Sequence, residues 1–237
     1  MKSLLIIGGN SDIGFELAKK FTVDNYKIIL ASRNIEDLKI KKNIINKMNA
    51  ECEIYYFDIE QHTTHKSFLD NLSNKPEIIV ISAGYLEKEE INFNKIININ
   101  YLSLLNFIET FISKKDLFDN LKSIIGISSL AGERGKERLN VYSSAKAGFS
   151  NYLDGLRQRL FKKNKKVITV KPGFVKTKMT KDLQLNPLLI VTPEKIAGKI
   201  YRDFQKNKLI IYPSLLWRFI IVIYKLIPEK IFIKLKT

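Results

Sequence analysis

LLIIGGNSDIG at residues 4–14 joins a short apolar run to a glycine-bearing turn, and this stretch decides the fold. An unbroken apolar run of this length is typical of a strand that is buried on both faces of a parallel sheet. Phe15, Leu17, Ala18 and Phe21 follow at helical spacing. A strand, a tight glycine turn and a helix N-terminus bring bare backbone and free N–H groups toward an anion. The segment therefore predicts a strand–turn–helix unit that binds a pyrophosphate.

The rest of the chain repeats this alternation of apolar runs and amphipathic segments. The pattern predicts an α/β domain in which a doubly wound, parallel, seven-stranded sheet has helices on both faces. Such sheets bind ligands at the carboxyl ends of their strands. The length of 237 residues suits one domain of this kind. We expect strands near residues 2–7, 27–31, 53–57, 77–82, 122–128, 166–171 and 208–212, and helices near residues 13–23, 35–48, 61–72, 89–113, 141–162 and 193–206.

A tyrosine and a lysine, Tyr142 and Lys146, lie one helical turn apart in VYSSAKAG, thirteen residues after Ser129. Residues four apart share one face of a helix. A lysine ammonium beside a phenol stabilises the phenolate, so we expect the tyrosine pKa to move from about 10 toward neutrality, where the phenol exchanges protons. A serine hydroxyl at a strand end is suited to orient a carbonyl or an alcohol against that phenol. The spacing alone also fits an ordinary surface helix, but here it accompanies the glycine turn.

The end of the second expected strand indicates which nicotinamide cofactor is used. An acidic residue there usually binds the ribose of NAD, whereas a cation accommodates the 2′-phosphate of NADP. This chain has Ser32 and Arg33 at that point and no acid. An arginine pairs a phosphate through two hydrogen bonds, and a serine adds one more. We therefore expect NADPH in preference to NADH; the alternative is that Arg33 is a solvated surface residue.

The composition excludes several other classes of protein. The single cysteine, Cys52, excludes a disulfide framework, and no cluster has the spacing of a zinc site, so no metal is expected. The two histidines, His62 and His65, are expected as solvated surface residues of a helix. No signal peptide precedes the first strand, so we expect a cytoplasmic protein. The net charge of +16 suits an anionic surface, but the lysines are scattered, which argues against nucleic acid as the partner.

Residues 214–237 break the alternation and form an apolar, basic C-terminal extension. Its uncharged core, Phe219–Tyr224, is far shorter than the ~20 apolar residues that a membrane-spanning helix needs. Basic residues flank and interrupt the apolar run, and Trp217 and Tyr224 suit the role of amphipathic anchors. This combination favours a segment that lies on the membrane surface, on its cytoplasmic face. The alternative is a helix that packs on its own domain or on another subunit of a homo-oligomer.

Five motifs, in the expected order, resemble the short-chain dehydrogenase/reductase family over roughly residues 2–213. Gly8 and Gly14 match the G-x-x-x-G-x-G cofactor loop of that family, in which Asp12 replaces the middle glycine. A side chain there narrows the space for the diphosphate; Asp12 also suits a helix cap through its carboxylate. The other motifs are Ile81-Ser82-Ala83-Gly84 at the N-N-A-G element, Asn100, Ser129 with Tyr142 and Lys146, and Pro172 with Gly173 and Thr177.

The resemblance implies a Rossmann-type domain over residues 1–213, followed by the extension, and an enzyme that moves a hydride with a nicotinamide cofactor. It implies that Tyr142 is the general acid/base, that Lys146 lowers its pKa and holds the nicotinamide ribose, and that Ser129 binds the substrate oxygen. It also implies that Asn100 positions a water that relays protons to Lys146, that Thr177 holds the carboxamide, and that Asp58 contacts the adenine. The candidate catalytic residues are Asn100, Ser129, Tyr142 and Lys146, and the candidate cofactor-binding residues are Gly8, Asn10, Ser11, Asp12, Ile13, Gly14, Ser32, Arg33, Asp58, Ala83, Gly84, Tyr142, Lys146, Pro172, Gly173, Val175 and Thr177.

Four segments, GGNSDIG, AGER, KPGFVKTKM and LIPEKIF, narrow the resemblance to reductases that complete the epimerisation of a sugar on a polyprenyl phosphate. Such an enzyme is an NADPH-dependent carbonyl reductase of a 2-keto sugar in cell-envelope glycan synthesis, with a flavoprotein oxidase as its partner. Two alternatives stay open. One is a soluble reductase of a small carbonyl or a 3-oxoacyl thioester. The other is a cofactor-binding scaffold without catalysis, against which the complete set of Ser129, Tyr142 and Lys146 argues.

Overall fold

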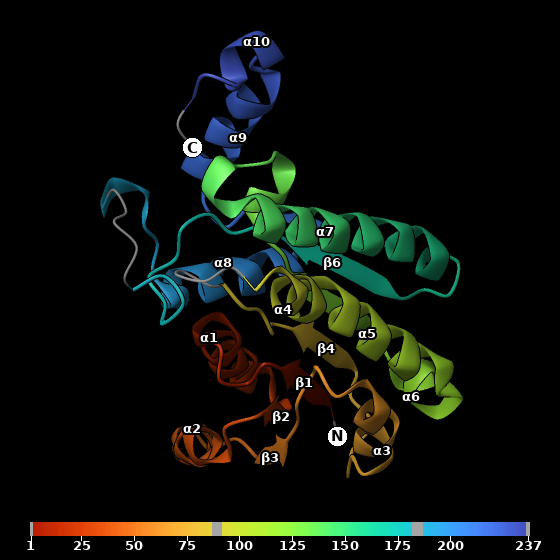
Figure 1. The fold of residues 1–237 in the computed structure, drawn as a ribbon. Coiled ribbons are helices and arrows are strands. Elements are labelled where there is room, and N and C mark those ends of the chain that lie inside the picture. Colours follow the sequence, from red (N-terminus) through yellow and green to blue (C-terminus); the bar gives the residue numbers. More distant parts are fainter. Residues whose placement is uncertain (1, 87–91, 182–186, 236–237) are drawn as a thin grey trace.

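A parallel sheet with helices on both faces forms the body of the protein (Figure 1). The computed structural model describes residues 2–86, 92–181 and 187–235. Within these residues, seven strands form one sheet in the order β3-β2-β1-β4-β5-β6-β7, with every neighbouring pair parallel, so the predicted fold class is confirmed. The strands are β1 (Ser3–Ile7), β2 (Lys27–Ser32), β3 (Cys52–Tyr56), β4 (Ile78–Ile81), β5 (Ser123–Ile127), β6 (Lys166–Val170) and β7 (Ile210–Ile211).

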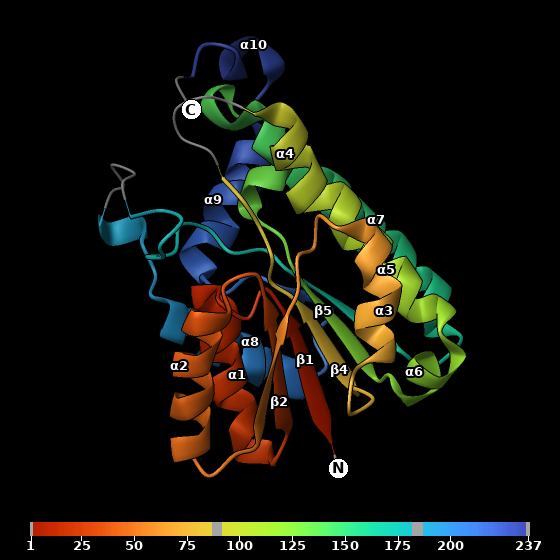
Figure 2. The same ribbon diagram turned by 60° about the horizontal axis from the view of Figure 1, so that its bottom comes forward.

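The strand order reverses beside β1, where the chain leaves the β3 edge and places β4 on the other side of β1 (Figure 2). Ligands of doubly wound sheets bind outside the carboxyl ends of the strands at such a switch point. The loops after β1 and β4 meet there, as the register of Ile7 opposite Ile81 requires. The topology therefore fixes the place of the site before any side chain is considered.

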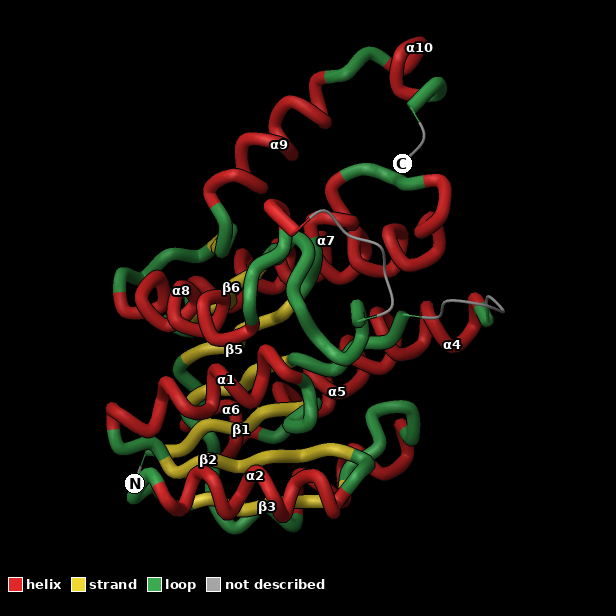
Figure 3. Tube along the Cα trace, turned by 90° about the vertical axis from the view of Figure 1, so that its left-hand side faces the viewer, coloured by secondary structure: helices red, strands yellow, loops and turns green. Residues whose placement is uncertain are grey.

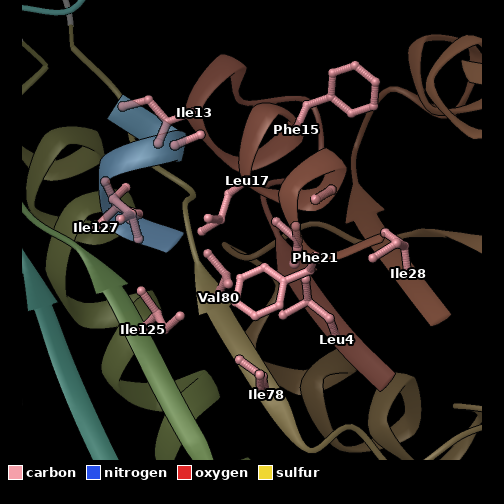
Figure 4. Close-up of a cluster of buried hydrophobic side chains, with 14 of the residues drawn as sticks. Leu4, Ile13, Phe15, Leu17, Phe21, Ile28, Ile78, Val80, Ile125 and Ile127 are labelled. Carbon is pink, nitrogen blue, oxygen red and sulfur yellow. The ribbon is translucent and has the colours of Figure 1, made fainter. Parts of the chain in front are cut away.

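The unbroken apolar run of β1 is explained by burial on both faces. Leu4 and Ile6 belong to one core, and Leu5 and Ile7 belong to the other. The first core, part of which is drawn in Figure 4, packs the sheet against α1 (Asp12–Phe21), α2 (Ile35–Lys47) and α8 (Pro193–Gln205). The second core packs it against α3 (His65–Asp70), α5 (Ser103–Ser113), α6 (Lys115–Asn120) and α7 (Asn140–Phe161).

The helix expected over residues 89–113 is divided in the structure. Residues 89–91 lie outside the described residues; from there α4 (Phe93–Ile97) leads through a π-helical turn, Asn98–Leu102, into α5. In the part of the chain that the structure describes, Phe93–Ser113 is the one helical stretch whose length and apolar composition suffice to cross a membrane. Leu104, Phe107 and Ile108 are fully buried against the sheet, so this stretch is a core element of the domain.

The expectation for His65 is wrong, because this histidine is fully buried. Its Nε2 lies 2.9 Å from the carbonyl oxygen of Ile59, and its ring packs against Phe57 and Phe107. Burial lowers the pKa of the imidazole, which favours the neutral form in this apolar setting. His62 is only partly buried and lies 2.8 Å from the hydroxyl of Ser103. The sequence pattern gave no sign of this aromatic cluster, because its members come from three separate elements.

The C-terminal extension forms two helices, α9 (Leu215–Leu226) and α10 (Glu229–Phe232), at one end of the molecule (Figures 1 and 3). Both proposed anchors turn toward the protein, so their assignment as membrane anchors is wrong. The indole Nε1 of Trp217 donates to the carbonyl of Leu189 at 2.8 Å, and the hydroxyl of Tyr224 is buried. The side of α9 that carries them packs on its own domain, with Ile221 only 6 % exposed.

Candidate active site

A cavity of about 340 Å³ opens at the carboxyl edge of the sheet. It is bounded by the loops that follow β1, β2, β4, β5 and β6 and by the start of α7. Most residues predicted for the site line it: Gly8, Asn10, Ser11, Asp12, Ile13, Ser32, Arg33, Ala83, Gly84, Ser129, Tyr142, Lys146, Pro172, Gly173, Val175 and Thr177. The predicted residues that do not line it are Gly14, Asp58 and Asn100.

The first glycine of the cofactor loop is required by its backbone. Gly8 has φ +85°, and a Cβ there would lie 2.6 Å from the amide nitrogen of Ala83. A side chain would therefore be strained and would push apart the loops after β1 and β4. Gly14 acts differently: it faces the side chain of Ser82, with 3.0 Å from an added Cβ to the hydroxyl oxygen. Because Gly14 has no side chain, α1 can lie close to the sheet at this point; Gly14 itself does not line the cavity.

Asp12 does not cap its helix, which corrects that expectation. Ser11 is the N-cap of α1, because its hydroxyl accepts the N–H of Gly14 at 3.3 Å. The Ser11 hydroxyl also lies 2.8 Å from that of Ser82, so the cap is tied to β4. The carboxylate of Asp12 accepts the backbone N–H of Lys178 at 2.8 Å. Asp12 thus links the cofactor loop to the loop after β6, on the opposite side of the cavity.

The end of β2 carries the expected cation in an ion pair. The guanidinium of Arg33 is 3.3 Å from a carboxylate oxygen of Glu60, and its side chain is 54 % exposed. Asn34 caps α2 by accepting the N–H of Asp37, and its carbonyl accepts the amide of Asn10 at 2.8 Å. The amide oxygen of Asn10 is buried and finds no hydrogen-bond partner among the described residues. An unpaired buried oxygen in this loop is a place where a donor on a ligand is favoured.

The side chains of Asp58 and Asn100 lie near the cavity and hydrogen-bond to backbone groups of the protein. One carboxylate oxygen of Asp58 accepts the N–H of Glu60 at 3.1 Å, which shapes the turn after β3. Asn100 is fully buried in the π-helical turn, where its side chain accepts the N–H of Tyr85 at 3.1 Å and donates to the carbonyls of Tyr85 and Ile96. Its amide oxygen lies beneath Gly84, 3.3 Å from where a Cβ would stand. Asn100 therefore fixes the loop that forms the floor beside Lys146.

The first two turns of α7 bring Tyr142 and Lys146 to Ser129. The hydroxyl of Ser129 lies beside the phenol of Tyr142, where it acts to lower the pKa of the phenol, and both residues line the cavity. Lys146 is 3 % exposed, and its ammonium donates to the carbonyl of Ile127 at 3.3 Å. The same ammonium lies 5.8 Å from the centre of the Tyr142 ring. Ser128 holds α7 in this position, because its hydroxyl donates to the carbonyl of Lys146 at 3.1 Å.

Burial shifts the pKa values of Tyr142 and Lys146 and so decides whether each is charged. It raises the pKa of Tyr142 to about 12, although the hydrogen bond from Ser129 acts in the opposite direction. It lowers the pKa of Lys146 to about 8, because a buried ammonium is poorly solvated. The shift of the phenol is opposite to the one expected from the lysine: in this state the phenol stays protonated at neutral pH and is ready to donate.

Sequence reasoning missed part of the cavity wall. The additional lining residues are mostly apolar and lie next to the motifs in the sequence, and that proximity is the signal that could have found them. They are Ile7, Phe57, Ile59, Ser82, Ile99, Ile127, Ser128, Lys178, Met179 and Thr180. Trp217 was also missed as a neighbour of the site: its ring lies where a Cβ on Gly173 would stand, at 2.5 Å.

The residues present fit a nicotinamide dinucleotide. A glycine that must lack a side chain, the N-terminus of α1 and an unpaired amide oxygen face one end of the cavity, and the Ser129–Tyr142 pair faces the other. The first set suits a diphosphate, and the second suits a reacting oxygen. Among the described residues, no group of three or more His, Cys, Asp or Glu side chains has the arrangement of a metal site.

Known proteins share this chain's sequence pattern. Residues 2–187 match the family model described as short chain dehydrogenase. Carbonyl reductase family member 4 of Xenopus laevis is 27 % identical over 215 residues, which cover 84 % of this chain and 89 % of that protein. The 3-oxoacyl-[acyl-carrier-protein] reductase of Chlamydia trachomatis is 26 % identical over 195 residues, covering 78 % of each chain.

Solved structures share the fold. A short-chain dehydrogenase from Sphingobium yanoikuyae in complex with NADPH has a TM-score of 0.81 at 16 % identity, over 97 % of both chains. A 3-oxoacyl-[acyl-carrier protein] reductase from Brucella melitensis with bound NAD has a TM-score of 0.73 at 17 % identity, over 83 % of this chain and 81 % of that one. Both nicotinamide cofactors thus occur on this fold, and the fold alone does not select between them.

The buried charge of Lys146 predicts a dependence of stability on pH. Because its pKa is about 8 in the folded chain and ~10.4 when unfolded, the unfolded state binds more protons between these values. Its charge therefore destabilises the fold fully below about pH 8, and the penalty fades as the pH rises to ~10.4. We expect Lys146→Met to raise the free energy of unfolding of the cofactor-free protein at pH 7 by up to about 3 kcal/mol.

Urea unfolding of both proteins at pH 7 and near pH 10 measures this effect. The exposed Lys163, replaced by Met, is the matched control and should give no such difference. The prediction would be contradicted if Lys146→Met were less stable than the wild type at pH 7. It would also be contradicted if the difference in free energy of unfolding between the two proteins grew with pH.

Proposed function

The chain belongs to the short-chain dehydrogenase family and is a nicotinamide-dependent oxidoreductase of carbonyl or CH–OH groups; we propose that it reduces a 2-keto sugar carried on a polyprenyl phosphate, with NADPH. The observation that carries the reductase assignment is that Ser129, Tyr142 and the buried Lys146 line the same cavity. A protonated phenol next to a second hydroxyl is the arrangement that a carbonyl oxygen needs when it gains a proton.

The residues divide the work of the reduction. When bound, the nicotinamide supplies the hydride. Ser129 donates to the substrate oxygen and holds it against Tyr142, whose phenol then delivers its proton. The raised pKa of Tyr142 keeps that proton in place at neutral pH, and Lys146 is charged below about pH 8, so it stabilises the phenolate left behind.

Lys146 and Asn100 prepare the tyrosine for the next turnover. In the proposed mechanism Lys146 holds the nicotinamide ribose and passes a proton toward the phenol. The side-chain hydrogen bonds of Asn100 go to the backbone of Tyr85 and Ile96, so we assign it a positioning role. In that role it holds the loop at the floor of the cavity in a position that leaves room for a relay water beside Lys146.

The preference for NADPH rests on Arg33. Arg33 lines the cavity directly after β2, and the end of that strand carries no acidic residue that could bind the ribose. Glu60 holds the guanidinium at 3.3 Å across an exposed contact, which is worth little and yields readily to a phosphate. Ser32 lines the cavity beside it and adds a hydroxyl donor.

The substrate proposal is supported by sequence segments and by charge. AGER, KPGFVKTKM and LIPEKIF resemble decaprenylphosphoryl-2-keto-erythro-pentofuranose reductase, which works after a flavoprotein oxidase in cell-envelope synthesis. The net charge of +16 suits an anionic, lipid-linked substrate. The competing substrate class is a small carbonyl or a 3-oxoacyl thioester, which is favoured by the names of the relatives from Xenopus laevis and Chlamydia trachomatis.

A substrate panel separates these classes. The full-length protein is incubated with NADPH and, in turn, a 2-keto pentose on a polyprenyl phosphate, the same keto sugar without lipid, and a 3-oxoacyl thioester. We expect the highest kcat/KM for the lipid-linked sugar. A higher value for the thioester would overturn the substrate proposal but keep the reductase, and no cofactor oxidation with any carbonyl would favour a scaffold.

Tyr142→Phe tests the proton donor. The change removes the transferable proton and little contact area, so we expect turnover to fall by about 10²- to 10⁴-fold while NADPH binding stays nearly unchanged. Tyr152 is the matched control, because it lies on the same helix and hydrogen-bonds Glu109, away from the cavity. Tyr152→Phe should keep its turnover; substantial turnover in Tyr142→Phe would reject the assignment.

Arg33→Ala tests whether Arg33 binds the 2′-phosphate of NADPH. Loss of a charge-assisted contact should weaken NADPH by about 1–3 kcal/mol and leave NADH nearly unchanged. Glu60→Gln is the complementary variant: it releases the guanidinium, so NADPH should bind more tightly. Fluorescence titration of both cofactors measures these constants, and an equal loss for NADPH and NADH in Arg33→Ala would exclude this arginine as the phosphate ligand.

A further inference from the structure

The helix α9 has two apolar faces, of which the domain covers one. Trp217, Ile221 and Tyr224, spaced as i, i+4 and i+7, turn toward the protein. Trp217 packs edge-on against Phe174, with 5.2 Å between ring centres, and lies over Gly173. Since Gly173 lines the cavity, the inner face of α9 is part of the wall behind the site.

A single arginine fixes the far end of the extension. Arg134 donates to the carbonyls of Tyr224 and Ile227 at 2.7 and 2.8 Å and pairs with Glu229 at 2.6 Å. Its guanidinium also lies 3.6 Å from the ring centre of Phe232. Arg134 belongs to the loop of residues 129–134, which we call the catalytic loop because it carries the proposed catalytic residue Ser129. The orientation of α9 and α10 is therefore set by the catalytic loop.

The outer face of α9 is apolar and exposed. Phe219 is 69 % exposed and Ile223 is 66 % exposed, on the side of the helix opposite Ile221. Among the described residues, eight of the eighteen exposed large apolar side chains fall between residues 216 and 235. They are Leu216, Phe219, Val222, Ile223, Leu226, Ile231, Ile233 and Leu235, and they form what we call the outer patch. Such a concentration marks an interaction site, since single exposed apolar residues are scattered on ordinary surfaces.

The charged residues around the outer patch are mostly basic. Residues 214–235 contain four cations and one acid, and that acid, Glu229, is paired with Arg134. Arg218, Lys230 and Lys234 are exposed beside the patch. Lys225 lies at the boundary of the two faces and pairs with Glu133 at 2.8 Å. The patch is therefore an apolar surface with a basic border.

We propose that the outer patch docks on the surface of a bilayer that contains anionic lipid. Two copies of the chain that met through this patch would bring their basic borders together, whereas anionic headgroups attract them. The patch lies on short helices at one end of the molecule (Figure 3), where a flat surface can reach it. Docking places the wall of the cavity at the lipid surface, because Trp217 on the inner face already contacts Gly173.

Deletion of the extension would not test this proposal alone, because it would also remove Trp217 and Ile221, which pack on the domain. Phe219→Glu changes the outer patch alone, and Phe161→Glu is the matched control, since Phe161 is 76 % exposed at the last residue of α7. Arg218→Gln with Lys234→Gln tests the border, with Lys162→Gln and Lys163→Gln as its control on exposed lysines. Binding of NADPH should be equal in all variants and reports that each is folded.

Co-sedimentation of the full-length protein with phosphatidylcholine vesicles, with and without phosphatidylglycerol, at low and high salt, is the measurement. We expect Phe219→Glu to lower partitioning at least about tenfold, and the border pair to lower it about fivefold per cation on anionic vesicles at low salt only. Both controls should partition as the wild type does.

Three results would overturn the proposal. The wild type stays in the supernatant with anionic vesicles; Phe161→Glu loses as much binding as Phe219→Glu; or Phe219→Glu changes the oligomeric state in light scattering without lipid, which would make the patch an interface between copies. The assay contains no carbonyl substrate, so its outcome is independent of the substrate panel.

Discussion

The burial of Lys146 under Tyr142 is the constraint on which the rest of the site depends. Its ammonium is only 3 % exposed and reaches the carbonyl of Ile127, so α7 must lie against the end of β5. Gly132 makes this possible, since a Cβ there would stand 2.7 Å from the backbone nitrogen of Ala147. The catalytic loop can then pass over α7 and present Ser129 to the phenol. A buried cation costs stability, and in the proposed mechanism that cost is offset by the use of a charge next to the tyrosine.

A second set of charges joins this loop to the C-terminal extension. Glu133 accepts from Lys171 at 2.5 Å and from Lys225 at 2.8 Å, which connects the residue after β6, the catalytic loop and α9. Burial raises the pKa of this carboxyl, but the hydrogen bonds from the two lysines outweigh it and lower the pKa overall. Together with Arg134, these contacts make α9 a structural neighbour of the active site. Contacts through Glu133 and Arg134 thus join the extension to the loop that begins at Ser129.

The sequence predicted the fold and most of the cavity because both follow from short-range patterns. Apolar runs located the strands, and the parallel topology then placed Gly8, Ser129 and Arg33 at one edge. Errors arose where distant segments meet. Asp12 was read as a cap because its partner, the N–H of Lys178, lies 166 residues away, and His65 was placed at the surface because Phe107 comes from another helix. For the extension, packing on its own domain was one of two open alternatives, because both faces of α9 are apolar and only the fold decides which one is covered.

The most direct test of the account is a crystal structure of the full-length protein with NADP⁺. We predict that the nicotinamide end lies beside Ser129 and Tyr142, that the diphosphate lies over Gly8 and the N-terminus of α1, and that Arg33 has left Glu60 for the 2′-phosphate. A cofactor bound elsewhere, or one whose nicotinamide lies out of reach of the Tyr142 phenol, would contradict the account.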